Sequence, residues 1–401
     1  MGEATPDESW IVPAVEAARR FGTPCYLFSW PHVLRALDEF SSIRGHIPVR
    51  HWLSLKSQPL RRLVKEWHAT GRGIEVVSEF ELEGASIERI EPSSIIVNGM
   101  AKHRWLSKYP LEGLRVNFDS LEEVRGLALI AKRRAWHVGL RFAVGMQFDI
   151  DDPAFSTQFG LTASEAREAV LVLGEAGIVA DTAHFHLMSN VASPTYYVDA
   201  ITEIAGICAE IGFAPRFVDC GGGLPCPGDD QDHCEKEGTA PADLNLVMDA
   251  VKKLLPEAEE LWLENGRFLT GRAGVLVLTV VDIKERPEGR YLVCDGGRTN
   301  HAIVSEWERH NLFTIPQRHG AKRLTTICGP TCMAFDRICR INLPEDVTRG
   351  DLVVWQNAGA YHIPWETRFS HGWAPVIWID EQSTMSKARD RETFSQWWRS
   401  H

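Results

Sequence analysis

Lys56 is the residue in this chain with the clearest potential for covalent chemistry. It ends the short apolar run His51-Trp-Leu-Ser-Leu-Lys56. An amine placed behind such a run can be desolvated, lose its proton and form a Schiff base with an aldehyde. A lysine taken alone is more often an ordinary surface residue. Its role therefore depends on which motifs accompany it along the chain.

Five further motifs follow Lys56 in order, and each contains residues suited to catalysis or ligand binding. They are His184-Phe-His-Leu-Met-Ser189, Asp219-Cys-Gly-Gly-Gly-Leu224, Glu264-Asn-Gly-Arg267, Cys328-Gly-Pro-Thr-Cys-Met-Ala-Phe-Asp336 and Asn357-Ala-Gly-Ala-Tyr361. Consecutive glycines let backbone N–H groups approach an anion closely. Each motif also has a structural interpretation, as a plain loop, a core histidine or tyrosine, a Glu–Arg pair or a buried thiol. The presence of all these motifs in one chain, in this order, favours the functional interpretation over the structural one.

The elements that must position these residues are predicted by the hydrophobic pattern. From about Phe28 to Glu264 short β-branched runs alternate with longer helical patterns, which indicates repeated βα units and an eight-stranded barrel. Residues at the C-terminal ends of barrel strands converge on one face, where Lys56 and His186 fall. The predicted strands include Ser94–Val97, Leu114–Asn117, His137–Arg141, Ala183–His186, Phe217–Asp219 and Leu261–Glu264, and the predicted helices include Ala163–Leu173 and Asp199–Glu210.

The pattern changes after about Gly271. Extended runs separated by turn residues replace the helical periodicity, as in Val275–Ile283, Tyr291–Val293 and Leu352–Trp355. This part of the chain is therefore predicted to be mainly β.

Composition narrows the class of protein. The 401 residues are 44% hydrophobic, enough for a large core and two domains. The formal charge of −11, with no concentrated Lys/Arg tract, argues against nucleic-acid or anionic-membrane binding. No signal peptide and no stretch of membrane-spanning length is evident, so we expect a cytoplasmic protein. The nine cysteines are scattered and odd in number, which favours reduced thiols.

One cluster has the residue types of a metal site. Cys220, Cys226, His233 and Cys234 lie close together in the sequence. They lack a paired C-x-x-C and fall in a Gly/Pro/Asp-rich segment. We therefore predict no metal.

The ordered motifs resemble the fold-type III pyridoxal-phosphate decarboxylases, the group that contains diaminopimelate and ornithine decarboxylases. The resemblance covers nearly the entire chain. It implies an α/β protein of the alanine racemase-like fold: a pyridoxal 5′-phosphate-binding (β/α)8 barrel over residues 29–270 and a β-domain formed by residues 1–28 and 271–401. Pro24–Phe28 are expected to contribute to that β-domain.

The same resemblance implies roles for individual residues. Lys56 would carry the cofactor, His186 would stack on the pyridine ring, and Glu264 would keep the ring nitrogen protonated, which makes the ring a strong electron sink. Glu75, where the family more often has aspartate, and Arg141 match other pocket positions. Met188 stands where a glycine is usual. The residues expected around the cofactor phosphate are Ser189, Gly221, Gly222, Gly223, Gly266, Arg267 and Tyr361.

Cys332 matches a cysteine that the family brings across a dimer interface, where it can protonate the carbanion left by decarboxylation. The resemblance therefore implies a homodimer with shared active sites. Lys56 and Cys332 are the expected catalytic residues.

Met333 bears on the choice of substrate. In the diaminopimelate and ornithine enzymes an acidic residue follows the cysteine and meets the substrate's distal amino group. A thioether cannot neutralise an ammonium. Nearby segments instead offer cations or potential cations for a distal carboxylate, although surface solvation would also explain any one of them: Arg298, His301, Arg309, His310 and Arg337.

The segments around Gly296–His301 and Thr157–Gly160 look closest to a branch that acts in siderophore and other specialised biosynthesis. We therefore expect an amino-acid substrate with a carboxylated or conjugated side chain, such as citryl-diaminopropionate. The alternatives are a diamino-acid decarboxylase, a racemase or epimerase, and a catalytically silent regulatory homologue. Glu264 argues against the racemase, in which an arginine takes that place. The presence of Lys56 and Cys332 argues against the silent homologue. The motifs specify the family and leave the substrate and its chirality open.

Overall fold

The computed structural model describes residues 7–41, 45–145, 158–191, 193–226, 244–301 and 310–400. The chain forms two compact units. The barrel unit consists of Asp38–Pro225 and Cys234–Gly266, and the β-domain consists of Met1–Leu37, Cys226–His233 and Arg267–His401. Over the described residues, no helix combines the length and the apolar character that crossing a membrane requires.

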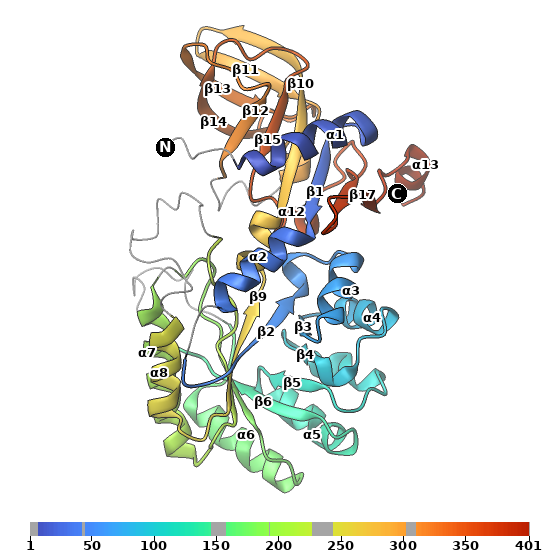
Figure 1. Cartoon of the computed structure of the whole chain (residues 1–401). Helices are drawn as coiled ribbons and strands as arrows, with labels where there is room; N and C mark the ends of the chain where they lie inside the picture. The colour runs from blue at the N-terminus through green and yellow to red at the C-terminus, as the bar shows by residue number, and fades with distance from the viewer. Residues whose placement is uncertain are drawn as a thin grey trace. The chain divides into compact units, whose positions relative to one another are not determined.

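The barrel unit is a closed barrel of eight parallel strands in which the last strand pairs with the first (Figure 1). The register places Trp52 opposite Gly73 and opposite Glu264. This confirms the predicted (β/α)8 architecture. The strands are β2 (Val49–Ser54), β3 (Gly73–Val76), β4 (Ile95–Val97), β5 (Arg115–Phe118), β6 (His137–Arg141), β7 (Thr182–His184), β8 (Phe217–Asp219) and β9 (Glu260–Asn265).

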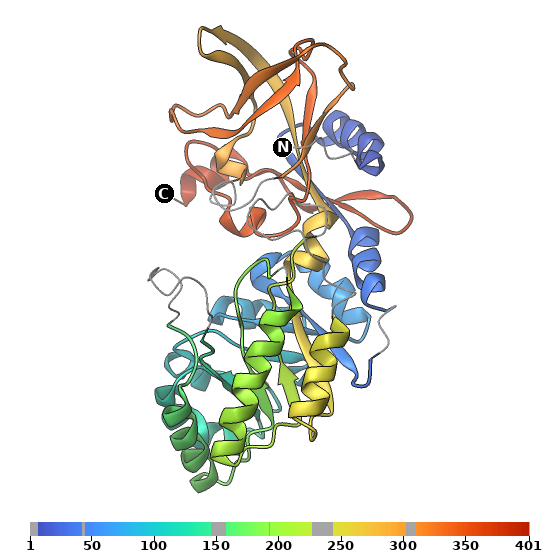
Figure 2. The same ribbon diagram turned by 90° about the vertical axis from the view of Figure 1, so that its left-hand side faces the viewer.

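Helices cover the outside of these strands (Figures 1 and 2). Several begin at a side-chain cap: Ser78 and Ser120 accept the N–H groups of Glu81 and Glu123, and Thr162 forms a capping box with Glu165. The α-helices are α3 (Arg61–Ala69), α4 (Glu79–Ile87), α5 (Leu121–Arg133), α6 (Ala163–Glu175), α7 (Pro194–Ile211) and α8 (Leu244–Leu254). The 3-10 helices are η2 (Leu55–Ser57), η3 (Pro92–Ser94), η4 (Lys102–Arg104) and η5 (Leu106–Lys108).

Large aromatic side chains fill the interior of the barrel. Trp52, Ile96, Phe217 and Trp262 form one buried cluster, in which the rings of Phe217 and Trp262 stack at 4.6 Å. Gly73 makes room for this layer, because a Cβ atom there would lie 2.1 Å from the Trp52 ring. The barrel is therefore a packed core, and chemistry is confined to its ends.

The β-domain contains a nine-stranded mixed sheet with the order β14-β13-β11-β10-β1-β16-β17, while β15 pairs with β10 and β12. The N-terminal strand β1 lies between β10 and β16, antiparallel to the first and parallel to the second. The strands are β1 (Cys25–Ser29), β10 (Gly274–Arg286), β11 (Gly289–Cys294), β12 (Leu312–Ile315), β13 (Lys322–Cys328), β14 (Arg337–Pro344), β15 (Leu352–Trp355), β16 (Val376–Ile379) and β17 (Met385–Arg389).

Short helices connect these strands. Helix α2 (Trp30–Ser41) begins in the β-domain and ends in the barrel unit. The other helices of the β-domain are η1 (Glu8–Trp10), α1 (Ile11–Phe21), α9 (Arg267–Thr270), η8 (Gly271–Ala273), α10 (Arg298–His301), α12 (His362–Trp365) and α13 (Phe394–Arg399).

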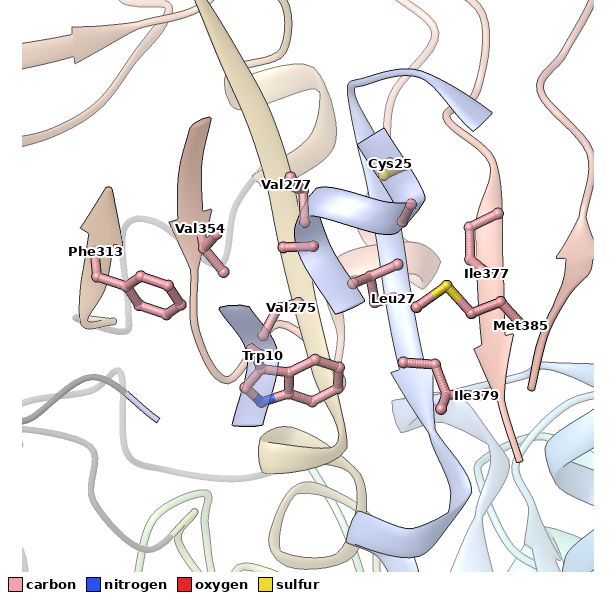
Figure 3. Close-up of a cluster of buried hydrophobic side chains, with 12 residues drawn as sticks. Trp10, Cys25, Leu27, Val275, Val277, Phe313, Val354, Ile377, Ile379 and Met385 are labelled. Atoms are coloured by element: carbon pink, nitrogen blue, oxygen red, sulfur yellow. The ribbon is translucent and has the colours of Figure 1, made fainter. Parts of the chain in front are cut away.

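One apolar core holds the β-domain together (Figure 3). Trp10 and α1 cover a sheet face to which Leu27, Val275, Ile377 and Met385 contribute from four different strands. Burying a side chain of this size stabilises the fold by about 1.5–3 kcal/mol. The N-terminal strand is thus fixed to segments more than 240 residues later in the chain, for example through the pair Leu27–Val275.

Candidate active site

Lys56 lies directly beyond the C-terminal end of β2, in η2. Its Nζ is 3.3 Å from both carboxylate oxygens of Glu75, on β3. Glu75 is fully buried and also accepts a hydrogen bond from the Ser54 hydroxyl at 2.5 Å, whereas 35% of the Lys56 side chain is exposed. The amine is therefore held by a fixed carboxylate while a reactant can still approach it.

Gly266 packs against the turn that carries this lysine. A Cβ atom on Gly266 would lie 2.8 Å from Cβ and Oγ of Ser57. Because that space belongs to the Lys56 turn, only glycine lets the end of β9 pass so close. Gly266, predicted as a phosphate residue, has this packing role within the barrel unit.

Asn98 joins the two carboxylates of the site. It follows β4 directly and donates its Nδ2 hydrogens to Glu264 and, at 3.3 Å, to Glu75. Its side-chain oxygen is buried and has no hydrogen-bond partner among the described residues. Asn98 was not predicted as a site residue, although its position after the predicted strand Ser94–Val97 was a signal.

Glu264 occupies a site that disfavours its charge. Burial, followed by the charges of Asp219 and Glu75, raises the pKa of Glu264 well above its ordinary value. Burial likewise raises the pKa of Asp219, which hydrogen-bonds to Glu264, to about 7. The His184 Nε2 lies 3.4 Å from Glu264, and burial holds the pKa of His184 well below its ordinary value. At the ends of β7, β8 and β9, the site therefore combines a neutral imidazole with two carboxyls, Asp219 and Glu264, whose raised pKa values favour their protonated forms.

His186 is oriented by the glycine triplet. The Gly222 N–H donates to His186 Nδ1 at 3.1 Å, which places the ring proton of the neutral imidazole on Nε2. Burial and the charge of Lys56 lower the pKa of His186 to about 3. The Gly221 N–H donates to Asp219 at 3.0 Å. Both amides are therefore directed to side chains of the barrel, which differs from the expectation that the whole triplet faces an anion.

The triplet also packs against the loop that follows β7. Gly223 has φ +102, and a Cβ atom there would lie 2.3 Å from the carbonyl oxygen of Met188. The Val191 N–H donates to the Gly223 carbonyl at 2.8 Å. Ser189 in the same loop is exposed. Glycine at 223 is thus required by backbone conformation and by close approach.

Arg141 ends β6 and is paired within the barrel. Its Nη1 is 3.2 Å from Asp119, which follows β5, and its guanidinium lies over the Phe159 ring at 4.4 Å. Nearby, Lys102 and Glu123 form a fully buried ion pair at 2.7 Å. Burial raises the pKa of Asp119, and the positive charges of Arg141 and Lys102 offset only part of that rise. Arg141 therefore belongs to a buried network of alternating charges.

Arg267 and Tyr361 lie together in the β-domain. The Arg267 guanidinium is 4.7 Å from the centre of the Tyr361 ring. Tyr361 has φ +62, a left-handed conformation that costs energy for a residue with a bulky side chain. Both were predicted to bind the same phosphate, and the structure brings them into contact with each other.

Cys332 is an exposed free thiol in the turn between β13 and β14. Asp336 organises this turn: its buried carboxylate accepts from the Thr331 N–H and hydroxyl at 3.0 and 2.6 Å and from the Arg298 N–H at 2.7 Å. Gly297 and Gly329 pass close to it, since a Cβ atom on either would lie within 2.4 Å of that carboxylate. The cysteine is thus presented by a turn with internally satisfied polar groups.

The residues predicted to contact the substrate lie in different surroundings. Met333 is half-buried in the same turn, and Arg298 reaches the Phe335 carbonyl at 3.5 Å. His301 is fully buried among other histidines of the β-domain. Four residues singled out in the sequence, Thr157, His233, Cys234 and Arg309, lie outside the described residues, and Cys220 and Cys226 are buried.

Comparison with known proteins agrees with this arrangement. Residues 33–271 match the family described as "Pyridoxal-dependent decarboxylase, pyridoxal binding domain". The diaminopimelate decarboxylase of Archaeoglobus fulgidus is 26% identical over 373 residues, covering 87% of this chain and 86% of the relative. A structure of diaminopimelate decarboxylase from M. jannaschii in complex with L-lysine superposes with a TM-score of 0.82 at 21% identity, covering 96% and 93% of the two chains. A lysine/ornithine decarboxylase from Vibrio vulnificus complexed with cadaverine gives 0.76 at 22% identity, covering 94% and 99%.

Proposed function

The chain belongs to the pyridoxal-dependent decarboxylase family, and within it we propose that this protein decarboxylates a diamino acid of the diaminopimelate, lysine or ornithine type. Membership makes pyridoxal 5′-phosphate the cofactor and amino-acid decarboxylation the reaction. The substrate class is supported by relatives named diaminopimelate decarboxylase and by related structures that hold L-lysine or cadaverine.

The residues of the barrel fit the cofactor. Bound pyridoxal phosphate supplies an electron sink for the carbanion that remains when carbon dioxide leaves. Glu264 shares its surroundings with an excess of acidic groups, Asp219 and Glu75, and burial followed by their charges raises the pKa of Glu264. A protonated ring nitrogen would offset that excess. Lys56 supplies a partly exposed amine at the same strand ends.

The observation that carries the reaction type is the buried carboxyl of Glu264, fixed by Asn98 at the end of β9. A carboxyl can exchange a proton with a basic ring nitrogen and hold a positive charge there, which an arginine cannot do. Lys56 would hold the cofactor, and His186 would cover its ring. Arg267 and Tyr361 of the β-domain would bind its phosphate.

We also propose that Cys332 protonates the α-carbon across a homodimer interface. Its exposed thiol, in a turn held by hydrogen bonds to Asp336, supports this role. Mixing Lys56→Ala and Cys332→Ala proteins under exchange conditions tests it, because a hybrid dimer then regenerates one intact site. Activity near about a quarter of the native value, from two inactive parents, is expected for shared sites. No recovery from chains that do exchange would contradict sharing.

A second candidate is favoured by the turn that carries Cys332. Met333 offers no carboxylate to a distal ammonium, and Asp336 is fully engaged by Thr331 and Arg298. Arg298 places a cation beside the same turn. These contacts support a substrate with a carboxylated or conjugated side chain, such as citryl-diaminopropionate, and with it a role in siderophore or other specialised biosynthesis.

A substrate panel distinguishes the two candidates. Purified, cofactor-loaded protein is incubated with meso-diaminopimelate, lysine, ornithine, glutamyl conjugates and citryl-diaminopropionate, and loss of carbon dioxide is followed by mass spectrometry. Turnover of a free diamino acid supports the first proposal, and turnover of acidic conjugates alone supports the second. Absence of carbon dioxide release from every compound, with chiral inversion of one of them, would overturn both in favour of a racemase.

Met333→Glu sharpens this comparison. It introduces a carboxylate next to Cys332 and should raise kcat/KM for a diamino acid relative to an acidic conjugate by at least about tenfold. Ala334→Glu is the matched control, because it adds the same charge at the adjacent exposed position. Equal effects of the two substitutions would show that residue 333 does not face the side chain of the substrate.

A further inference from the structure

Three buried histidines come together in the β-domain. They are too far apart in the sequence to form a recognisable motif. His301 ends α10, His310 precedes β12, and His362 begins α12. Their exposed fractions are 0%, 8% and 0%. One ring nitrogen of each lies within 4.8 Å of one ring nitrogen of the other two. Among the residues that the structure describes, the group contains no carboxylate or thiolate.

Backbone carbonyls fix which nitrogens carry lone pairs. His362 Nδ1 is 3.0 Å from the Ala360 carbonyl oxygen, and His310 Nδ1 is 3.1 Å from that of Gln356. A carbonyl oxygen only accepts, so both Nδ1 atoms carry the proton, and both Nε2 atoms keep a lone pair while the rings are neutral. Backbone carbonyls hold metal-ligating histidines in this way.

His301 has a ring lone pair for which the described part of the chain supplies no donor. Its Nδ1 lies 2.5 Å from His362 Nε2, so Nδ1 donates to the lone pair of that nitrogen, and a metal ion bound by His362 Nε2 would replace this hydrogen bond. The lone pair is then on Nε2, which is buried and has no hydrogen-bond partner among the described residues. Trp355 packs edge-on against the ring at 4.7 Å. Buried polar atoms are normally satisfied, so this nitrogen calls for a ligand.

The spacing of the rings matches three ligands around one ion. The ring centres are 4.5 Å apart for His301 and His362, 5.1 Å for His310 and His362, and 5.2 Å for His301 and His310. With Zn–N bonds of about 2.1 Å, imidazole rings arranged tetrahedrally around zinc have centres roughly 5 Å apart. Neutral imidazole is also a ligand that late first-row divalent ions prefer.

We propose that His301, His310 and His362 form a binding site for a divalent transition-metal ion, with Zn²⁺ as the expected occupant. The ion would link α10, the segment before β12 and α12. Both helices adjoin residues of the candidate active site, since α10 begins at Arg298 and α12 follows Tyr361. The role is structural, and it does not depend on the proposed reaction. It assigns to His301 a function other than the substrate contact predicted from the sequence.

The test measures metal directly in untagged wild-type protein. After growth with added zinc, elemental analysis should find one zinc per chain. After removal with a chelator, titration with Co²⁺ should produce the visible absorption bands of a low-coordinate site. A wild-type protein with no stoichiometric zinc and no cobalt bands would overturn the proposal.

Two substitutions locate the site and keep the hydrogen bonds that tie residues 310 and 362 to backbone carbonyls. In His310→Asn and His362→Asn the amide nitrogen can still donate to Gln356 or Ala360, while the ligating Nε2 is lost. Each should weaken metal binding by at least about tenfold. His319→Gln is the matched control, because His319 is an exposed histidine of the same domain, and it should bind zinc as the wild type does.

The variants must also distinguish the histidine site from a second possible metal site. His184, Asp219 and Glu264 of the barrel also group their ligand atoms within 4.8 Å. Zinc retained by both His→Asn variants at wild-type affinity would place the metal there or elsewhere and overturn the proposal. Far-UV circular dichroism of the variants shows whether a loss of binding accompanies a loss of fold. The cobalt spectrum of the wild type tests the proposal in either case.

Discussion

Asp219 should make the protein without cofactor less stable as the pH rises toward neutrality. Its carboxyl is completely buried, and burial raises its pKa from 3.8 to about 7. As the pH rises past 4, the unfolded chain releases this proton while the folded chain retains it. The unfolded state is therefore increasingly favoured until the pH reaches about 7, where the folded state releases the proton as well.

The size of the effect follows from the pKa difference. Each pH unit over which only the unfolded state is ionised removes about 1.4 kcal/mol of stability, so a window of ~3 units amounts to about 4 kcal/mol. About 3 kcal/mol of this loss falls between pH 5 and pH 8. This is a large fraction of the stability of a typical protein.

The assay compares wild type, Asp219→Asn and Asp199→Asn by urea unfolding at pH 5 and pH 8, after removal of the cofactor with hydroxylamine. Asp199 is an exposed aspartate of α7 and serves as the matched control. Asp219→Asn should lose less stability between the two pH values than the wild type and the control, by up to about 3 kcal/mol. The same pH dependence in all three proteins would refute the protonation of Asp219, whatever the absolute stabilities.

Other substitutions test single contacts. Lys102→Met leaves Glu123 buried without the ammonium 2.7 Å away and should lower the free energy of unfolding by about 3–5 kcal/mol in urea denaturation; a loss below about 1 kcal/mol would contradict a fully buried pair. Glu264→Gln should slow carbon dioxide release by about 100-fold while the absorbance of bound cofactor is retained; an unchanged kcat would exclude the proposed role. Gly297→Ala puts a Cβ atom 2.3 Å from Asp336 and should lower the melting temperature and the activity together; a native melting curve would show that the turn can adapt.

Hydrophobic periodicity located much of the barrel from the sequence. The predicted strands His137–Arg141 and Phe217–Asp219 coincide with β6 and β8, and Leu352–Trp355 coincides with β15. These are short apolar runs with clear boundaries. The predicted strand Ala183–His186 extends two residues beyond β7. Alternation of buried residues continues through Phe185 and Leu187 after the strand has ended, so the pattern alone could not place this boundary.

The candidate site was predictable where chemistry requires a particular residue type at a strand end. Lys56, Glu75 and Glu264 do converge, as parallel strands in a barrel require. Asn98 and Asp219 were missed as members of the site. A polar residue that ends a strand looks the same in sequence whether it faces solvent or supports a neighbour, and only the burial and partners found in three dimensions distinguish the two.

Helix α10 places two neighbouring residues in different sites, which their closeness in the sequence did not indicate. Arg298 and His301 were grouped as cations near Cys332, and they lie three residues apart on a single helical turn. Arg298 is half-buried at the turn that Asp336 organises, whereas His301 is enclosed with His310 and His362. Burial and the two other histidines hold the pKa of His301 well below its ordinary value, so it is a neutral ligand rather than a cation. The proposed attraction of an acidic substrate therefore rests on Arg298, and substituting it should affect substrate preference without affecting metal content.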